Sequence, residues 1–184
     1  MNITIINGII DTQASPYEMQ LELACVRLSK SHKVDLFTIE DMDINYCRGC
    51  FNCWLKTPGL CMFRDDMGKV LKSVVETDLL LVVSPLDTGF LTSEAKKAMD
   101  RLLPTLLPYF RIYGGECHHI PRYEKRSSLG VIVLDDGSAD REALDIVYGT
   151  FYRLAKNFHA KKIIRAEAGL ENLSEVLENE ISGC

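Results

Sequence analysis

Short apolar runs alternate with longer amphipathic segments along most of the chain. Five runs rich in β-branched and aliphatic residues predict strands at residues 2–7, 34–39, 79–83, 129–134 and 162–166. The segments between them have helical periodicity, which predicts helices at about residues 17–31, 65–76, 93–103, 140–158 and 171–180. The run at 79–83 is apolar throughout, as is typical of a central parallel strand covered on both faces.

This alternation predicts the α/β class, as a three-layer sandwich around a five-stranded parallel sheet with right-handed crossovers. No internal repeat or linker divides the chain, so we expect one domain over residues 1–184, with a cysteine-rich loop at 45–64. Residues 108–127 hold Gly114-Gly115 and several aromatic rings but match no regular element. We interpret this tract as an insertion that forms a hairpin or flap.

Two serines mark expected helix starts. Ser15 precedes Pro16, and a serine cap followed by proline at the first helical position is a common opening. Ser93 stands in the same relation to the helix that ends near Leu103. We therefore expect both serines to be N-caps.

Composition and charge restrict the class of partner. The chain has 47% hydrophobic residues and a formal net charge of -5, values of an ordinary globular protein that argue against a nucleic-acid partner. No apolar run approaches the ~18 residues of a membrane span, and the first residues read as a strand rather than a secretion signal. We expect a cytoplasmic protein, in which thiols stay reduced.

The most informative motif is a run of cysteines after the second predicted strand. Four of the seven cysteines, Cys47, Cys50, Cys53 and Cys61, have the spacing C-x2-C-x2-C-x7-C. A compact run of this kind with one more distant ligand commonly holds an iron–sulfur cluster through four thiolates. The turn at residues 58–59 can return the fourth cysteine to the other three, and the single tryptophan beside the third can shield the centre from water.

Other interpretations of the run remain open. The thiols can be inert and packed like small hydrophobic groups, or they can be redox-active. They can hold structural zinc, although zinc sites usually pair two separate C-x2-C knuckles. A disulfide framework is disfavoured by the odd total of seven cysteines.

Three loops are expected to meet at one edge of the sheet. They cover residues 8–15, 84–92 and 135–139, and each follows the carboxyl end of a predicted strand. Ligands of open parallel sheets bind beyond these ends, at the point where the strand order reverses. The sequence therefore predicts a ligand site formed by the three loops.

Several motifs resemble a known family. The segment Ser84-Pro85-Leu86-Asp87-Thr88-Gly89-Phe90, with Ser93 and the tract 97–101, resembles the flavodoxin-like NAD(P)H-dependent FMN reductase superfamily. The cysteine run followed by Asp65-Asp66-Met67, together with residues 56–59, 108–110 and 116–123, resembles its iron–sulfur flavoprotein branch. The resemblance implies a flavodoxin-like sheet of strand order 2-1-3-4-5.

The resemblance also implies bound FMN, NAD(P)H as reductant and electron transfer in a homodimer or homotetramer, with a quinone, free flavin or redox partner protein as acceptor. The FMN phosphate would lie over the first loop at a helix N-terminus, and the ring against residues 84–90. The implied metal ligands of a [4Fe–4S] cluster are the four cysteines of the run. The implied cofactor-binding residues are Asn7, Gly8, Thr12, Gln13, Ser15, Ser84, Pro85, Leu86, Asp87, Thr88, Gly89, Phe90 and Asp135.

The first loop departs from the family pattern, which has an arginine followed by hydroxyl and amide residues. Residues 7–15 contain no Arg or Lys, and Asp11 places an unfavourable charge beside a phosphate. Asp87 and Asp135-Asp136 add further negative charge. The alternative function is therefore a flavin-free structural or regulatory relative, whose cysteine loop is ordered by thiol packing or a metal.

Three residue pairs remain as weaker candidates. His118-His119 can bind a metal or a substrate, although such a pair is more often an ordinary loop feature. Arg122-Tyr123 can contact a nicotinamide cofactor or a neighbouring subunit. We expect Asp100-Arg101 to form a structural charge pair at a helix or subunit surface rather than to supply a catalytic acid.

Overall fold

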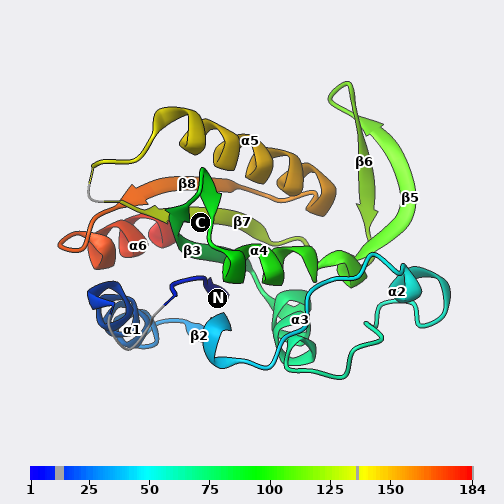
Figure 1. Ribbon diagram of the computed structural model, residues 1–184, viewed down its shortest axis with the longest axis horizontal. Coiled ribbons are helices and arrows are strands. Elements are labelled where there is room, and N and C mark those ends of the chain that lie inside the picture. The colour runs from blue at the N-terminus through cyan, green and yellow to red at the C-terminus, as the bar shows by residue number, and fades with distance from the viewer. Residues whose placement is uncertain (11–14, 136, 184) are drawn as a thin grey trace.

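The computed structural model describes residues 1–10, 15–135 and 137–183. Its main sheet has the strand order β2-β1-β3-β7-β8, and each neighbouring pair is parallel (Figure 1). These strands are β1 (Asn2–Asn7), β2 (Lys33–Thr38), β3 (Leu79–Asp87), β7 (Ser128–Leu134) and β8 (Ile163–Ala168). When these five strands are numbered by their order in the chain, their order across the sheet is 2-1-3-4-5, so the predicted flavodoxin-like topology is confirmed.

Helices cover both faces of the sheet, which gives the predicted three layers. One face packs against α1 (Pro16–Leu28) and α6 (Leu173–Ser182). The other face packs against α3 (Met67–Glu76), α4 (Ser93–Asp100) and α5 (Arg141–Phe158). Alternate residues of β3 enter the two cores, with Leu81 on the first side and Leu80 and Val82 on the second. An apolar residue is therefore required at each of these positions, which explains the continuous run.

The sheet is tightly packed at β7, which lies between β3 and β8. A Cβ atom at Gly130 would lie 2.7 Å from both Leu81 Cδ1 and Ile164 Cβ. Such distances are shorter than any ordinary contact, so the neighbouring side chains fill the space that a larger residue would need. Glycine at this position is a packing requirement of the core.

Helix starts agree with the sequence prediction at one serine and differ at the other. Ser15 is the residue before α1, but its side chain makes no capping hydrogen bond. The N-cap of α4 is Thr92 rather than Ser93, because Thr92 Oγ1 accepts a hydrogen bond from Ala95 N. Thr92 also donates its hydroxyl to Gly8 O, so the same side chain joins the helix start to the first loop. The expectation for Ser93 is wrong by one residue.

The tract interpreted as an insertion contains an antiparallel hairpin that projects beside α5 (Figure 1). Its strands are β5 (Leu106–Tyr113) and β6 (Glu116–Pro121), joined by Gly114 and Gly115 with φ of 59° and 79°. Two successive left-handed residues are the requirement of a tight two-residue turn. The irregular composition of the segment therefore conceals two strands.

Polar contacts fasten the hairpin to α5. Lys156 Nζ lies 2.8 Å from Glu116 Oε2, and the same carboxylate oxygen lies 3.0 Å from His118 Nε2. Asn157 Oδ1 accepts a 2.9 Å hydrogen bond from the backbone N of His119 and lies 3.3 Å from His118 Nδ1. His118 is buried and takes part in this anchoring network.

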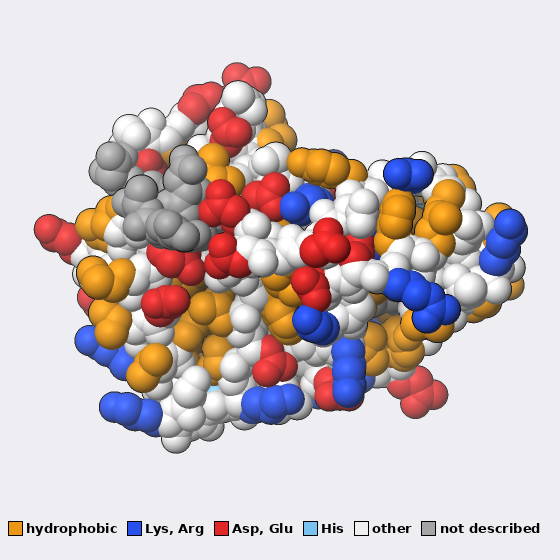
Figure 2. Space-filling view, turned by 60° about the horizontal axis from the view of Figure 1, so that its bottom comes forward, with side chains coloured by type: hydrophobic (Ala, Val, Ile, Leu, Met, Phe, Trp, Pro, Cys, Tyr) orange, Lys and Arg blue, Asp and Glu red, His pale blue; other side chains and the backbone are white. Residues whose placement is uncertain are grey.

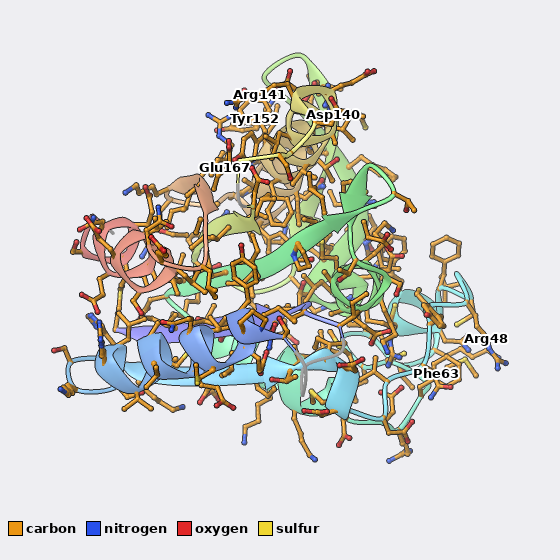
Figure 3. All side chains as sticks on the ribbon, turned by 60° about the vertical axis from the view of Figure 1, so that its left-hand side comes forward. Arg48, Phe63, Asp140, Arg141, Tyr152 and Glu167 are labelled. Atoms are coloured by element: carbon orange, nitrogen blue, oxygen red, sulfur yellow. The ribbon has the colours of Figure 1, made fainter. Side chains whose placement is uncertain are left out.

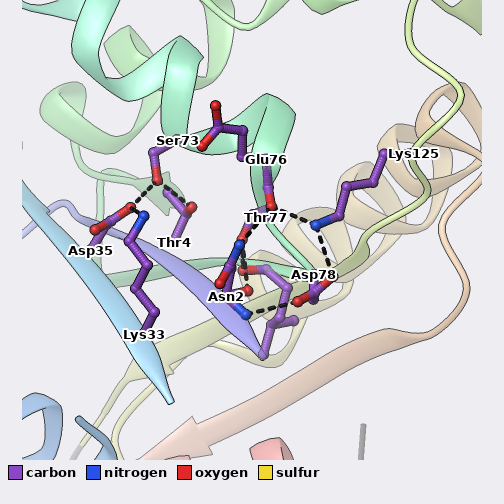
Figure 4. A network of polar contacts seen from close by, with 10 residues as sticks. Asn2, Thr4, Lys33, Asp35, Ser73, Glu76, Thr77, Asp78 and Lys125 are labelled. Carbon is purple, nitrogen blue, oxygen red and sulfur yellow. Dashed lines mark hydrogen bonds and ion pairs between the residues drawn. The ribbon is translucent and has the colours of Figure 1, made fainter.

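A separate polar network closes the amino-terminal edge of the sheet, opposite the predicted ligand loops (Figure 4). Asp78 Oδ2 accepts a 2.7 Å hydrogen bond from Asn2 N, and Asp78 Oδ1 lies 2.9 Å from Lys125 Nζ. Ser73 joins the hydroxyl of Thr4 to the carboxylate of Asp35.

Within the described part of the chain, no helix has the length and apolar character needed to cross a membrane.

Candidate functional site

The carboxyl ends of β3 and β7 border an open pocket of about 450 Å³. This volume lies within the roughly 300–1,000 Å³ typical of small-ligand sites. The pocket is lined by Tyr17, Pro85, Leu86, Thr88, Gly89, Leu134, Asp135, Ser138, Ala139, Asp140 and Ala143. Five predicted cofactor-binding residues therefore meet around one space, at the sheet edge where α/β folds of this kind bind ligands.

The middle loop is a tight hairpin between β3 and the two-residue strand β4 (Phe90–Leu91). Thr88 and Gly89 occupy its turn with φ of 49° and 86°, both in the left-handed region. A branched residue at positive φ is strained, and such strain persists only where the surrounding structure over-determines it. The hairpin presents Thr88 and Gly89 to the pocket, whereas the exposed Asp87 is not among its lining residues.

Other predicted residues make hydrogen bonds and packing contacts in the same loops but do not line the pocket. Gly8 N donates a 2.8 Å hydrogen bond to Val83 O, and a Cβ atom at Gly8 would lie 2.5 Å from Ala95 Cβ. Asn7 Nδ2 donates to Glu18 Oε2 at 2.6 Å, and the buried Ser84 hydroxyl bonds within its own segment. The pocket lining does not include Asn7, Gly8, Ser15, Ser84, Asp87 or Phe90.

The described pocket lining is acidic. Asp135 Oδ1 accepts hydrogen bonds from the backbone N of Ser138 and of Ala139, at 3.0 and 2.9 Å, and so shapes the third loop. Asp140 caps α5 through Glu142 N. No basic residue stands among the described lining residues. Asp11, Thr12, Gln13 and Asp136, which the sequence placed near this site, lie outside the described residues.

The four cysteines of the run line a second, smaller cavity of about 20 Å³. Arg48, Phe51, Met62, Phe63, Asp100, Arg101, Leu103 and Pro104 complete its wall. Cys53 is buried and Cys61 half-buried, whereas Cys47 and Cys50 are exposed. All four cysteines therefore line one cavity, and their role as metal ligands stays a prediction.

Left-handed residues and the tryptophan determine how the cysteine loop folds. Gly49 and Phe51 have φ of 61° and 54°, which turns the chain into the short helix α2 (Asn52–Leu55). Trp54 Nε1 then donates to Leu103 O at 3.3 Å and Leu106 O at 3.0 Å. The indole of Trp54 anchors the loop to the segment that leads into β5.

Arg101, which lines the cysteine cavity, belongs to a buried ion pair. The guanidinium of Arg101 bonds both carboxylate oxygens of Asp65 at 2.9 Å, and its Nη1 also donates to Asn45 O. The side chains of Arg101 and Asp65 are 1% and 3% exposed. The predicted pairing of Asp100 with Arg101 is therefore wrong, because Asp100 turns outward to Lys96 at 2.5 Å.

The pKa values of the Asp65 carboxyl and the Cys53 thiol are both shifted from their usual ranges. Burial alone would raise the pKa of Asp65, but hydrogen bonds from Arg101 and Asn45 outweigh it and hold that pKa well below its usual range. Burial, followed by the charges of Cys61 and Cys47, raises the pKa of the Cys53 thiol. Four thiolates are therefore unfavourable together unless a cationic group joins them.

Two further features surround the cysteine loop. A larger pocket of about 680 Å³ shares Cys61, Met62 and Phe63 with the small cavity and opens toward α3. In Figure 2, basic and hydrophobic side chains share the right-hand end of the visible face, where Figure 1 places α2. Among the described residues, no three His, Cys, Asp or Glu side chains are arranged closely enough to hold a metal ion. The four cysteines line one cavity without being gathered closely around a single point.

The sheet order, the helical layers and the pocket at the carboxyl edge define an α/β protein with the flavodoxin-like fold. Solved structures share this architecture over the whole chain. An FMN-dependent NADH-azoreductase from Bacillus anthracis str. Ames Ancestor, in complex with FMN, has a TM-score of 0.60 and 16% identity, covering 100% of this chain and 95% of that chain. An NAD(P)H:quinone oxidoreductase from Methanothermobacter marburgensis has a TM-score of 0.63 and 13% identity, covering 100% and 97%.

Sequence comparison gives a narrower result over part of the chain. An iron–sulfur flavoprotein from Archaeoglobus fulgidus is 36% identical over 85 residues, which are 46% of this chain and 38% of the relative. The chain has iron–sulfur flavoproteins as homologues and flavin-dependent reductases as structural neighbours, and the predicted resemblance is confirmed. The matches span about two fifths of the length of these curated relatives. No protein-family profile matches the chain.

Proposed function

We propose that this protein is an FMN-dependent oxidoreductase that also transfers electrons through a [4Fe–4S] cluster. The observation that carries the proposal is the cavity lined by Cys47, Cys50, Cys53 and Cys61 together. The homologous iron–sulfur flavoproteins support the cluster, and the neighbour solved with FMN supports the flavin. Cysteines stay reduced in the cytoplasm, the expected location, and four reduced cysteines form a suitable donor set for iron.

The pocket at the carboxyl edge would hold the flavin through its shape more than through charge. Pro85 and Leu86 offer an apolar wall for a planar ring, and the turn at Thr88 and Gly89 exposes backbone groups that can bond its edge. The described lining contains carboxylates and no basic side chain, so a phosphate would depend on backbone amides and the N-terminus of α1. The ring fits this donor set better than the phosphate does.

The cysteine loop would hold the cluster after a local rearrangement. The cavity of about 20 Å³ has room for little more than one water, and Cys50 Sγ lies 3.4 Å from Met62 Sδ. Cluster binding would move the exposed Cys47 and Cys50 outward, while the buried Cys53 stays beside the anchored Trp54. Such movement is inexpensive at exposed loop positions, which have few packing contacts to lose.

A bound flavin accepts a hydride from NAD(P)H, and a cluster passes single electrons. The chain would hold the two groups at separate places, with the flavin pocket on the β3 and β7 loops and the cysteine cavity beside α4. A quinone, a free flavin or a protein would accept the electrons. The protein's own contribution is orientation, exclusion of water and electrostatic tuning.

Anaerobic reconstitution of the purified protein tests the proposal directly. We expect about four iron and four sulfide per chain, FMN bound, and flavin bleaching on addition of NADH or NADPH. Cys50→Ser should lose most of the iron yet keep FMN, whereas Cys117→Ser, on the hairpin outside the cavity, should keep both. Protein without iron after reconstitution would remove the cluster, and protein that binds no FMN would remove the oxidoreductase.

A second candidate is a flavin-free structural relative, favoured by the acidic pocket and by a cysteine loop that protein contacts, such as those of Trp54, already hold in place. It predicts a colourless protein whose thiols are reduced and whose loop is equally protected from hydrogen exchange with or without iron. Absorbance between roughly 350 and 500 nm is the simplest discriminating measurement, because flavins and iron–sulfur clusters absorb there and folded polypeptide does not.

A further inference from the structure

Arg101 has an unusual set of contacts for a buried arginine. Its side chain is 1% exposed, and its hydrogen bonds go to Asp65 and to Asn45 O. A guanidinium has five N–H donors in a fixed plane. The bonds to Asp65 and Asn45 use both donors of Nη1 and one donor of Nη2. Within the described part of the chain, the buried Nε has no hydrogen-bond partner at all.

The two unused donors point the same way. In a planar guanidinium, the N–H of Nε and the outer N–H of Nη2 lie along one edge and form a fork suited to a single anionic group. Asp65 and Asn45 occupy the other two edges. A buried donor without a partner is unfavourable, so a free edge of this kind is uncommon without an occupant.

The free edge belongs to a residue in the wall of the cysteine cavity. Arg101 lines that cavity together with Cys47, Cys50, Cys53 and Cys61. Burial lowers the pKa of Arg101, but the hydrogen bonds of Asp65, followed by the charge of Cys61, outweigh it and hold that pKa above its usual value. The ring of Phe63 packs beside it, 5.3 Å from the Arg101 guanidinium carbon.

A second arginine shows the contrast. The guanidinium carbon of Arg48 lies 5.1 Å from the centre of the same Phe63 ring, but Arg48 is exposed at the margin of the loop (Figure 3). Solvent and salt screen an exposed charge, whereas a buried charge acts through a medium of low effective dielectric. Of the two arginines that line the cysteine cavity, Arg101 is the buried one and is placed to exert a strong and fixed effect.

We propose that Arg101 is a positioning residue for the cluster, whose free Nε edge donates hydrogen bonds to a thiolate or sulfide sulfur in the cysteine cavity and raises the cluster's reduction potential. Hydrogen bonds to sulfur and nearby positive charge stabilise the more negative, reduced cluster more than the oxidised one. Asp65 holds the guanidinium in plane and in register. This inference rests on the proposed cluster of the preceding section.

The test uses the reconstituted full chain and two variants that keep the site foldable. Arg101→Lys keeps the charge but removes the planar fork. The double variant Asp65→Asn/Arg101→Gln removes both charges together, because removing one alone would leave an uncompensated buried charge. The matched control is Glu94→Gln/Lys97→Gln, which removes another poorly exposed ion pair of α4 that does not line the cavity.

Redox titration followed by electron paramagnetic resonance gives a readout that a merely structural role would not move. At the wild-type midpoint potential, we expect the ratio of reduced to oxidised cluster to fall about tenfold in the double variant, a shift of about 59 mV for one electron. A smaller shift in the same direction is expected for Arg101→Lys. The control should match the wild type in potential even if its melting temperature falls.

The outcomes separate the inference from the proposed function. Wild-type and variant clusters that load fully and titrate at one common potential would overturn the role of Arg101 and leave the cluster in place. A wild type that binds no iron would overturn the proposed cluster and this inference with it. A folded Arg101→Lys protein that loads no iron, beside a control that loads fully, would support positioning of the cluster by Arg101.

Discussion

The indole ring of Trp54 lies 5.0 Å from the imidazole ring of His119, tilted by 47°. Phe51 stacks against the indole at 5.3 Å, and Phe110 packs against His119 at 4.3 Å. Two of these rings come from the cysteine loop and two from the β5–β6 hairpin. The loop that carries the cysteines is therefore held by the hairpin that the sequence marked as an insertion.

Trp54→Phe tests that anchoring. Phenylalanine keeps an aromatic ring for the stack but removes the hydrogen bonds to Leu103 O and Leu106 O. We expect a loss of about 0.5–1.5 kcal/mol in unfolding free energy and faster amide exchange over residues 47–61, because the indole hydrogen bonds are lost while Leu103 O and Leu106 O keep their other donors, Leu106 N and Arg122 Nη2. Urea denaturation and hydrogen exchange measure the two effects. Unchanged exchange in the loop would show that packing alone holds it.

The contact between Glu116 and α5 predicts a stability change at acid pH. Hydrogen bonds from Lys156, then from His118, lower the pKa of Glu116 from 4.5 to about 2. A lowered carboxyl pKa contributes stability that is present above the unfolded value and is lost as pH falls through the folded one. We therefore expect hairpin docking to weaken between about pH 4.5 and 2.

Glu116→Gln is the matched variant for this effect. It should be less stable than the wild type near pH 6 and should approach it as pH falls toward about 2, because the wild-type carboxylate is then protonated. Thermal melts at a series of pH values measure the difference. A gap between the two proteins that stays constant over the whole range would contradict the role of this carboxylate.

The first loop predicts weak binding of the flavin phosphate. Asp11→Ser removes a negative charge beside the expected phosphate and adds a hydroxyl donor, so we expect FMN to bind more tightly by about 1.5–3 kcal/mol. Titration calorimetry on apoprotein measures this difference. Asp145→Ser, an exposed carboxylate of α5, is the control and should bind like the wild type. Equal, tight binding to all three proteins would show that the acidic loop does not limit affinity.

The hairpin surface predicts self-association. Ile112 and Tyr109 are 75% and 66% exposed, and such large apolar side chains on a projecting element favour burial against another copy. We expect a homodimer or homotetramer at micromolar concentration, and we expect the double variant Tyr109→Ser/Ile112→Glu to dissociate it. Light scattering gives the mass of each form. A monomeric wild type would exclude the hairpin as an oligomer interface.

Local sequence patterns determined the elements of the sheet, and they predicted that the cysteines lie in one loop. The apolar run at 79–83 predicts a central strand because both of its faces must be apolar, and the structure buries all five residues. The cysteine spacing predicts convergence because three-residue intervals in a loop turn side chains toward a common side. Both properties depend on residues close in sequence, so a single sequence is sufficient to identify them.

The residue before α4 and the hairpin show where local patterns fail. Ser93 and Thr92 are both acceptable caps, and only the packing of Thr92 against Gly8, 84 residues away, selects between them. The strands of the hairpin lack a regular alternation of polar and apolar residues. They pair with each other and pack against α5. Their formation therefore depends on tertiary contacts that composition does not reveal.

The sequence by itself indicated the alternation of strands and helices, the flavodoxin-like strand order through the family resemblance, and four cysteines close together in one loop. The tertiary structure decided which charged groups surround the cysteine cavity. Arg101 meets Asp65 rather than its neighbour Asp100, because residues 36 apart in sequence are brought together in a buried space where an arginine must find a carboxylate. Sequence spacing predicts neighbours along one element, whereas the pairing of buried charges depends on how the elements pack.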